Sequence, residues 1–298
     1  MKAIVLTCDK NMFIVDHMIH TYQKFWYNNP FVFIVPYGKY AHNLHEKYGK
    51  KVELIETESE KLFYPIKTDK GTKKVSLIKK TVLSLLENIP DEEWIYWCID
   101  DKYLIQIKPE KVIKLYLWIK NIQDLSISGI CFCRGFPLAN NQNLKLDSKI
   151  YSPDGEVFLE RKNYEQIFCH QFVRAKVLKT LFATFPDRPF FPKEMDDFHR
   201  QVKIPNNQKL YVIKENNMVS FGESTIAGKL TLNCTLSFQK HRFEIPQNYE
   251  ISDRRMIFGE LPITLWGKKI VLPEYLKKNQ HKFDGQYIKY KIKKLLAH

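Results

Sequence analysis

The sequence predicts an α/β protein in which a mostly parallel β-sheet is flanked by helices. In the first half of the chain, short apolar runs rich in β-branched and aromatic residues alternate with helical patterns, which is typical of parallel strands joined by crossover helices. The chain has 298 residues, of which 44% are hydrophobic, so it is long enough to bury the core that such a sheet needs. Only 11 Gly and 14 Pro are present, which argues against fibrous and disordered classes.

Strands are predicted where an apolar run is bounded by polar or turn-forming residues. They cover residues 3–7, 31–35, 52–55, 94–99 and 126–132. Helices are predicted between them, over residues 12–25, 39–47, 75–89 and 109–120. The pattern is clearest in 75–89, where Val82, Leu85 and Ile89 recur at the spacing of one helical face.

The second half of the chain is less regular. A polar loop at 140–143 is followed by an amphipathic helix over 175–185. Another helix is predicted to begin at Pro192, because proline suits the first helical position. Residues 217–235 are predicted to be strand and loop.

The charge of the chain favours polyanionic partners. The formal net charge is +14, which suits nucleic acid, an anionic membrane surface or phosphorylated ligands. The basic residues are spread along the chain without a helix-turn-helix, zinc-finger or RNA-binding signature. We therefore expect no specific nucleic-acid partner.

The cysteines and the N-terminus indicate the compartment. Six cysteines lie in apolar surroundings without the spacing of metal ligands, as reduced thiols of cytoplasmic proteins do. The N-terminal apolar run is too short for a signal peptide, and no run approaches the roughly 20 residues that span a bilayer. We expect a cytoplasmic protein that is at most peripheral to the membrane.

Two adjacent acids, Asp100 and Asp101, follow the apolar strand 94–99. Ligands of open α/β sheets bind at the carboxyl ends of the strands. A sugar nucleotide leaves as a diphosphate, whose charge is balanced by Mg²⁺ or Mn²⁺ held on oxygen ligands. Two neighbouring carboxylates repel each other unless a cation compensates them, which favours a metal site over a simple turn, although Asp is also common in turns.

Residues 94–103, Trp-Ile-Tyr-Trp-Cys-Ile-Asp-Asp-Lys-Tyr, resemble the DxD-type segment of GT-A glycosyltransferases. The end of the first strand, Leu6-Thr7-Cys8-Asp9, is similar to the family's nucleotide-binding start. The resemblance implies a GT-A-like Rossmann-type fold, Mn²⁺ or Mg²⁺ as cofactor, and a nucleotide-sugar donor, with a UDP-sugar expected. Because Ile99 stands where a first acid often occurs, the number of carboxylates on the metal stays open.

The resemblance also implies roles for individual residues. Asp101 is expected to bind the metal, and Asp100 to bind the metal or the donor's ribose or sugar. Thr7 and Asp9 are expected to face the base or ribose, although Asp9 equally fits a cap of the following helix. Arg134, directly after the strand 126–132, is expected to contact the diphosphate.

A general base is expected near the start of the helix at Pro192, where inverting GT-A enzymes commonly place it. Asp197 is the first choice, Glu194 the second, and Asp196 fits as well. A carboxylate there would take the proton of the acceptor hydroxyl. The alternative is that these acids only complement the helix dipole in its first turn.

We expect two parts, a GT-A-like catalytic domain over residues 1–244 and a basic C-terminal appendage over residues 245–298, and the resemblance covers roughly residues 1–235. A nucleotide-binding half (about 1–135) precedes an acceptor half (about 136–244) that would bind a glycan or lipid-linked acceptor. The last thirty or so residues interleave many Lys with Tyr, Ile and Leu. This tail suits either contact with an anionic membrane or a packed helix with solvated lysines.

Two other functions compete with glycosyl transfer. A Mg²⁺-dependent nucleotidyltransferase usually has a Gly-rich basic loop after its first strand, and residues 7–11 contain no glycine. A non-enzymatic basic nucleic-acid-binding module would leave Asp100 and Asp101 without a role. Residues 222–231 are not a P-loop, because five residues separate the glycines and Leu230 follows the lysine; we predict a loop or turn near the site.

Overall fold

The computed structural model describes residues 1–38, 43–57, 77–135, 138, 141–188, 192–246, 249–259, 263–265 and 268–270; of these, Pro192, Lys193, Asp196, 263–265 and 268–270 are described by their backbone alone. Several predicted features therefore lie partly or wholly outside the described residues. They are the start of the helix 39–47, the first residues of the helix 75–89, part of the loop 140–143, and most of the lysine-rich tail.

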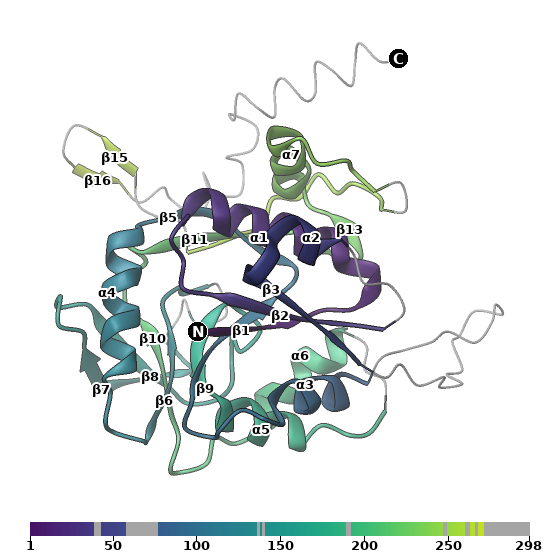
Figure 1. Ribbon diagram of the computed structural model, residues 1–298. Coiled ribbons are helices and arrows are strands. Elements are labelled where there is room, and N and C mark those ends of the chain that lie inside the picture. Colours follow the sequence, from purple (N-terminus) through teal and green to yellow (C-terminus); the bar gives the residue numbers. More distant parts are fainter. Residues whose placement is uncertain are drawn as a thin grey trace.

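A nine-stranded sheet forms the centre of the molecule, in the order β3-β2-β1-β4-β9-β6-β10-β8-β7 (Figure 1). Its strands are β1 (Lys2–Leu6), β2 (Val32–Tyr37), β3 (Val52–Glu56), β4 (Trp94–Ile99), β6 (Ile127–Cys131), β7 (Leu144–Tyr151), β8 (Val157–Arg161), β9 (Gln171–Arg174) and β10 (Lys209–Ile213). Strands β3, β2, β1 and β4 are parallel neighbours, and β6 is parallel to β10. The short strand β9 runs antiparallel to both β4 and β6, so β6 and β10 share the direction of β1. The predicted α/β class with a mostly parallel sheet is confirmed.

Helices cover both faces of this sheet (Figure 1), as a parallel sheet requires. On one face, Tyr96 and Cys98 of β4 pack in the same cluster as residues of α1 (Met12–Phe25) and α4 (Pro109–Lys120). On the other face, Ile95 and Trp97 pack with α3 (Ile78–Leu86) and α5 (Ala175–Ala183). The strand is apolar throughout because its alternate side chains enter two different cores.

A smaller antiparallel sheet lies beside the carboxyl end of β4. It consists of β5 (Lys102–Ile107), β11 (Val219–Glu223) and β14 (Ile257–Phe258). A hairpin follows β11, formed by β12 (Thr225–Ile226) and β13 (Lys229–Leu230). The remaining elements are α2 (Leu44–Tyr48), α6 (Pro192–Gln201), α7 (Leu232–His241), the short 3₁₀ helices Asp9–Asn11 and Gly49–Lys51, and the strands β15 (Ile263–Leu265) and β16 (Lys268–Ile270).

Residues 249–259, which the sequence boundary at 244 assigns to the appendage, are in contact with the main body. β14 pairs with β11. Tyr249 is buried, and its hydroxyl donates a hydrogen bond to Asn11 Oδ1 at 2.8 Å. This part of the chain therefore helps to build the region around the carboxyl end of β4.

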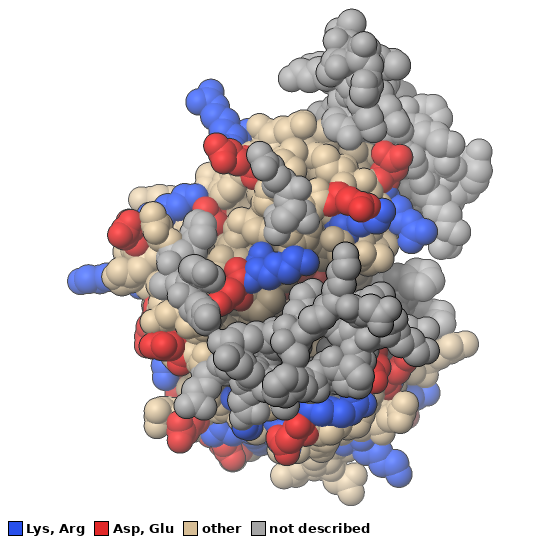
Figure 2. Space-filling view, turned by 90° about the vertical axis from the view of Figure 1, so that its right-hand side faces the viewer, with Lys and Arg blue, Asp and Glu red and all other residues tan. Residues whose placement is uncertain are grey.

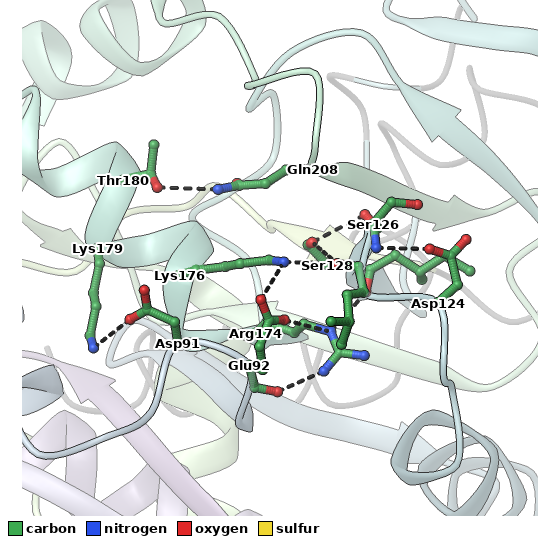
Figure 3. A network of polar contacts seen from close by, with 12 residues as sticks. Asp91, Glu92, Asp124, Ser126, Ser128, Arg174, Lys176, Lys179, Thr180 and Gln208 are labelled. Carbon is green, nitrogen blue, oxygen red and sulfur yellow. Dashed lines mark hydrogen bonds and ion pairs between the residues drawn. The ribbon is translucent and has the colours of Figure 1, made fainter.

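A polar network secures the opposite, amino end of β4 (Figure 3). The buried guanidinium of Arg174 donates to the backbone oxygens of Glu92 at 2.6 Å, Ile127 at 3.1 Å and Ile122 at 3.1 Å. Lys176 adds an ion pair to Glu92 at 2.9 Å. These contacts join the starts of β4 and β6 to the end of β9. Glu92, which precedes the strand, is therefore part of the scaffold.

The cysteines form no disulfide bonds. All six cysteines are free thiols, and all except Cys8 are buried. Within the described ranges, no helix is both long and apolar enough to cross a membrane.

Candidate active site

A cavity of about 890 Å³ opens at the carboxyl ends of β1 and β4. Thr7, Cys8 and Asn11 follow β1, and Asp100 and Asp101 follow β4, so neighbouring parallel strands bring them to one edge of the sheet. The hairpin β12–β13 forms one wall through Thr225, Ile226, Ala227 and Gly228. Another part of the lining comes from residues 165–169 and from α6.

Asp100 is fixed at this edge by two hydrogen bonds. Its Oδ2 accepts from Thr7 Oγ1 at 2.7 Å and from Asn11 Nδ2 at 2.9 Å. Its Oδ1 accepts no hydrogen bond from the residues that the structure describes. Burial, with a further contribution from neighbouring Asp101, raises the pKa of Asp100 to about 7, although the two hydrogen bonds and Lys102 oppose the rise. The fold therefore holds a carboxyl group where the surrounding positive charge is insufficient to ionise it fully at neutral pH.

Asp101 belongs to an ion-pair cluster around a buried lysine. Lys102, whose side chain is 6% exposed, places its Nζ 2.7 Å from Asp101 Oδ1 and 3.2 Å from Glu223 Oε1. Burial alone would lower the pKa of Lys102, but the carboxylates of Asp101 and Glu223 outweigh it and raise the pKa. The backbone fixes this arrangement, because Lys102 and Glu223 are partners in the β5–β11 pairing.

The end of β4 is supported from behind by His170. Its Nε2 donates to the backbone oxygen of Ile99 at 2.8 Å, and its Nδ1 accepts from Tyr22 at 2.6 Å. Burial lowers the pKa of His170 to about 3, so the ring is neutral. His170 therefore lies in the core, where it fixes the residue that precedes Asp100.

Helix α6 borders the cavity, but not through the acids that the sequence favoured. Met195, His199 and Arg200 line it. Asp197 is exposed and lies 3.6 Å from Arg200, whereas Glu194 lies 3.3 Å from Arg188. Neither acid is among the lining residues, and the side chain of Asp196 lies outside the described part. The helix was predicted where it occurs, but the face assigned to the site is not the one that lines the cavity.

Asp9 and Arg134 also lie outside the cavity lining. Asp9 Oδ1 accepts from the backbone N–H of Gly38 at 2.7 Å, which connects the ends of β1 and β2, and the N-cap position of α1 is occupied by Asn11. Arg134 donates to the backbone oxygens of Leu138 and Lys214. The structure thus gives the guanidinium of Arg134 a role in holding a loop; its contact with a diphosphate stays a prediction.

Several cavity residues were not identified from the sequence. Glu165 is buried, and its Oε1 lies 3.1 Å from Arg200 Nε. The adjacent Gln166 has a φ of 63°, a strained conformation for a residue other than glycine. No spacing rule marks these residues, because they follow a short strand and meet α6 only in the folded chain.

Charged side chains of both signs are interspersed on the face shown in Figure 2, where no broad patch of one sign is visible among the described residues. A nucleic-acid interface usually presents a continuous basic surface. This face does not have that character, despite the net charge of +14.

No model of a known protein family matches the sequence, and no curated protein matches it. Among solved structures, the galactosyltransferase LgtC, in complex with donor and acceptor sugar analogs, is 12% identical over 60% of this chain and 60% of its own, with a TM-score of 0.34. A 4-diphosphocytidyl-2C-methyl-D-erythritol synthase from Anaerococcus prevotii is 11% identical over 81% of this chain and 95% of its own, with a TM-score of 0.37.

A protein from Bacillus anthracis assigned as a glucose-1-phosphate thymidylyltransferase, in complex with sucrose, is 9% identical over 84% of this chain and 99% of its own, with a TM-score of 0.43. All three are similar to this chain only in the path of the backbone. The activities in their names belong to those proteins.

Proposed function

We propose that this protein is a glycosyltransferase of the GT-A type that transfers a sugar from a nucleotide-sugar donor, with a UDP-sugar as the first candidate. One observation carries the proposal. Two adjacent carboxyl groups, Asp100 and Asp101, lie in a large cavity at the carboxyl ends of parallel strands, and Asp100 is held there with a pKa raised to about 7 by burial and Asp101. Such a perturbed carboxyl in a cavity is typical of a functional site.

The carboxylates suit a divalent cation that is shared with a diphosphate. Among the described residues there is no group of three or more His, Cys, Asp or Glu side chains able to hold a metal, so a closed protein cage is absent from that part of the chain. Mg²⁺ is commonly bound by one or two carboxylates together with substrate phosphate oxygens and water. Asp100 Oδ1 and Asp101 Oδ2, which accept no hydrogen bond from described residues, would hold Mg²⁺ or Mn²⁺.

The charges of the site agree with this proposal. Asp100, Asp101 and Glu223 lie around the buried ammonium group of Lys102. When all four are ionised, a formal charge of about −2 remains, which equals the charge that one divalent ion supplies. When bound, the ion would neutralise the negative charge that develops on the leaving diphosphate.

The other parts of the cavity suggest where the substrates lie. Thr7 and Asn11 border Asp100 on the β1 side, and we place the nucleoside there. The acceptor would lie against residues 165–169 and α6, where Phe168 offers an apolar surface and Glu165 a carboxylate. Glu165 is the group we propose to take the proton of the acceptor hydroxyl, in place of Asp197 or Glu194.

Nucleotidyl transfer is disfavoured by the segment after β1. In a nucleotidyltransferase, a Gly-rich basic loop usually binds the triphosphate at this position. Here residues 9–11 form a 3₁₀ helix, and Asn11 holds Asp100. The segment therefore positions a carboxylate and leaves no glycine-lined space for phosphates.

Product analysis tests the proposal. The protein is incubated with a panel of nucleotide sugars, with Mn²⁺ or with EDTA, and the nucleotide released is identified by chromatography. Glycosyl transfer or donor hydrolysis releases a nucleoside diphosphate that depends on Mn²⁺. Pyrophosphate release from nucleoside triphosphates and sugar phosphates, without nucleoside diphosphate from any sugar nucleotide, would instead identify a nucleotidyltransferase.

A further inference from the structure

We propose that Lys102 is a positioning residue that sets the cation affinity of the site, by occupying one oxygen of Asp101 and by balancing the charge of Asp101 and Glu223. This inference rests on the proposed function, because it concerns the cation that Asp100 and Asp101 would hold. It adds a residue to which neither the resemblance nor the sequence pattern assigns a role.

The geometry favours one oxygen of Asp101 for binding a cation. Lys102 Nζ lies 2.7 Å from Asp101 Oδ1, within the range of a charge-assisted hydrogen bond. The ammonium group therefore disfavours a cation at Oδ1 and leaves Oδ2 as the favoured oxygen of Asp101. Lys102 has little freedom to move, because its side chain is 6% exposed and its Nζ lies 5.2 Å from the centre of the Phe258 ring.

The same ammonium group connects the cation site to the hairpin wall of the cavity. Lys102 Nζ is 3.2 Å from Glu223 Oε1, and the next residue, Ser224, donates its backbone N–H to the Asp101 backbone oxygen at 2.5 Å. Thr231, at the far end of the hairpin, donates to the backbone oxygen of Glu223. Lys102 therefore fixes Asp101 and the base of the hairpin to each other.

The charge of Lys102 opposes a second cation nearby. The cluster of Asp101, Lys102 and Glu223 has a formal charge of −1. It therefore attracts a divalent cation less strongly than the two carboxylates would without Lys102. A divalent ion consequently binds weakly to the protein alone, and binds firmly only when a diphosphate contributes further negative oxygens. Lys102 thus makes cation binding depend on the donor.

A series of variants separates this charge effect from a purely structural one. Lys102→Met changes the cluster charge to −2, Glu223→Gln changes it to 0, and the double variant Lys102→Met/Glu223→Gln restores −1. Mn²⁺ binding to each full-length protein is measured by electron paramagnetic resonance, without nucleotide and with UDP. Circular dichroism verifies that each variant is folded.

The proposal predicts that Mn²⁺ affinity without nucleotide follows the cluster charge. Lys102→Met binds about tenfold more tightly than the wild type and Glu223→Gln about tenfold more weakly, since a unit charge at short range contributes on this order. The double variant lies close to the wild type. If Lys102→Met does not fold, the test uses the wild type, Glu223→Gln and the double variant. A charge effect predicts that the double variant regains the Mn²⁺ affinity that Glu223→Gln loses, whereas a purely structural effect does not.

Two results would overturn the inference. Equal Mn²⁺ affinity across the series, with binding still enhanced by UDP, would refute the role of Lys102 and leave the proposed function intact. If neither the wild type nor any variant bound Mn²⁺, even with UDP, both the cation site and the role of Lys102 would be wrong.

Discussion

The burial of the Asp100 carboxyl group opposes folding at neutral pH. A carboxyl group whose pKa is raised on folding holds its proton more tightly in the folded state, so the folded protein loses stability as the pH rises from the unfolded value of 3.8 to about 7. Its two hydrogen bonds, from Thr7 and Asn11, reduce this cost without removing it. A raised pKa of this kind is consistent with the cation site that we propose.

Asp100→Asn is expected to stabilise the metal-free protein at pH 8 more than at pH 5. The asparagine oxygen still accepts from Thr7 and Asn11, but it carries no charge. The gain in the free energy of unfolding is up to roughly 1.4 kcal/mol for each pH unit between the unfolded and the folded pKa of Asp100. Urea unfolding in EDTA at the two pH values measures it; an equal effect at both would show that Asp100 is already fully ionised at pH 5.

Glu165 and Asp197 form a matched pair for locating the base. Glu165→Gln is expected to lower the turnover number by roughly 10²-fold or more, with little change in donor affinity, because it removes a proton acceptor that lines the cavity. Asp197→Asn is expected to have little effect, since Asp197 is exposed and outside the lining. Steady-state kinetics with a common donor decides, and the reverse pattern would return the role to α6.

Among the helices and strands, those with a strong local sequence pattern were predicted best. Strand β4 and helices α1, α4 and α6 were placed correctly, because apolar periodicity and proline positions mark them. Strand β9 was missed because it has only four residues, and β5 because it begins directly after β4 and its two acids, without a loop between the strands. Which face of α6 lines the cavity was not predictable, since it depends on contacts with residues 165–169 that are distant in sequence.

The hairpin β12–β13 offers a prediction at this scale. Gly228 at its turn and Gly155 in a surface turn have nearly equal φ angles, 77° and 78°, with nothing within 4 Å of an added Cβ. Changing either to alanine should cost about 1–2 kcal/mol of stability from backbone strain alone. Only Gly228→Ala should also weaken donor binding, because Gly228 lines the cavity.

Calorimetric titration of a nucleotide sugar into both variants checks this difference, with Gly155→Ala as the control for strain. Equal donor affinity in the two variants would mean that the hairpin turn does not contact the donor.

The charge of the whole chain and the charge around Asp100 have opposite signs. The chain carries a net charge of +14, whereas the cluster around Asp100 is negative. Composition correctly excluded a disordered chain, and the alternation of strands and helices indicated the sheet. Composition did not reveal that Lys102 is buried between two carboxylates, because this depends on the pairing of β5 with β11.

The lysine-rich tail, most of which lies outside the described residues, remains a prediction. If it binds anionic lipid, removal of residues 271–298 should abolish co-sedimentation with vesicles that contain phosphatidylserine, and added salt should weaken the binding of the full-length protein. Neutral vesicles serve as the control. Equal, salt-insensitive sedimentation of both proteins would exclude a membrane role for this tail.

Calorimetric titration of UDP-sugars with Mn²⁺ and with EDTA tests whether Asp100 and Asp101 bind a cation together with a nucleotide sugar. The wild type is compared with Asp101→Asn, which keeps an acceptor for Lys102, and with the surface control Asp154→Asn, whose partner is Lys114. We predict Mn²⁺-dependent binding of at least one UDP-sugar by the wild type and by Asp154→Asn, and its loss in Asp101→Asn. Binding that is equally strong in EDTA, or unchanged in Asp101→Asn, would contradict the account.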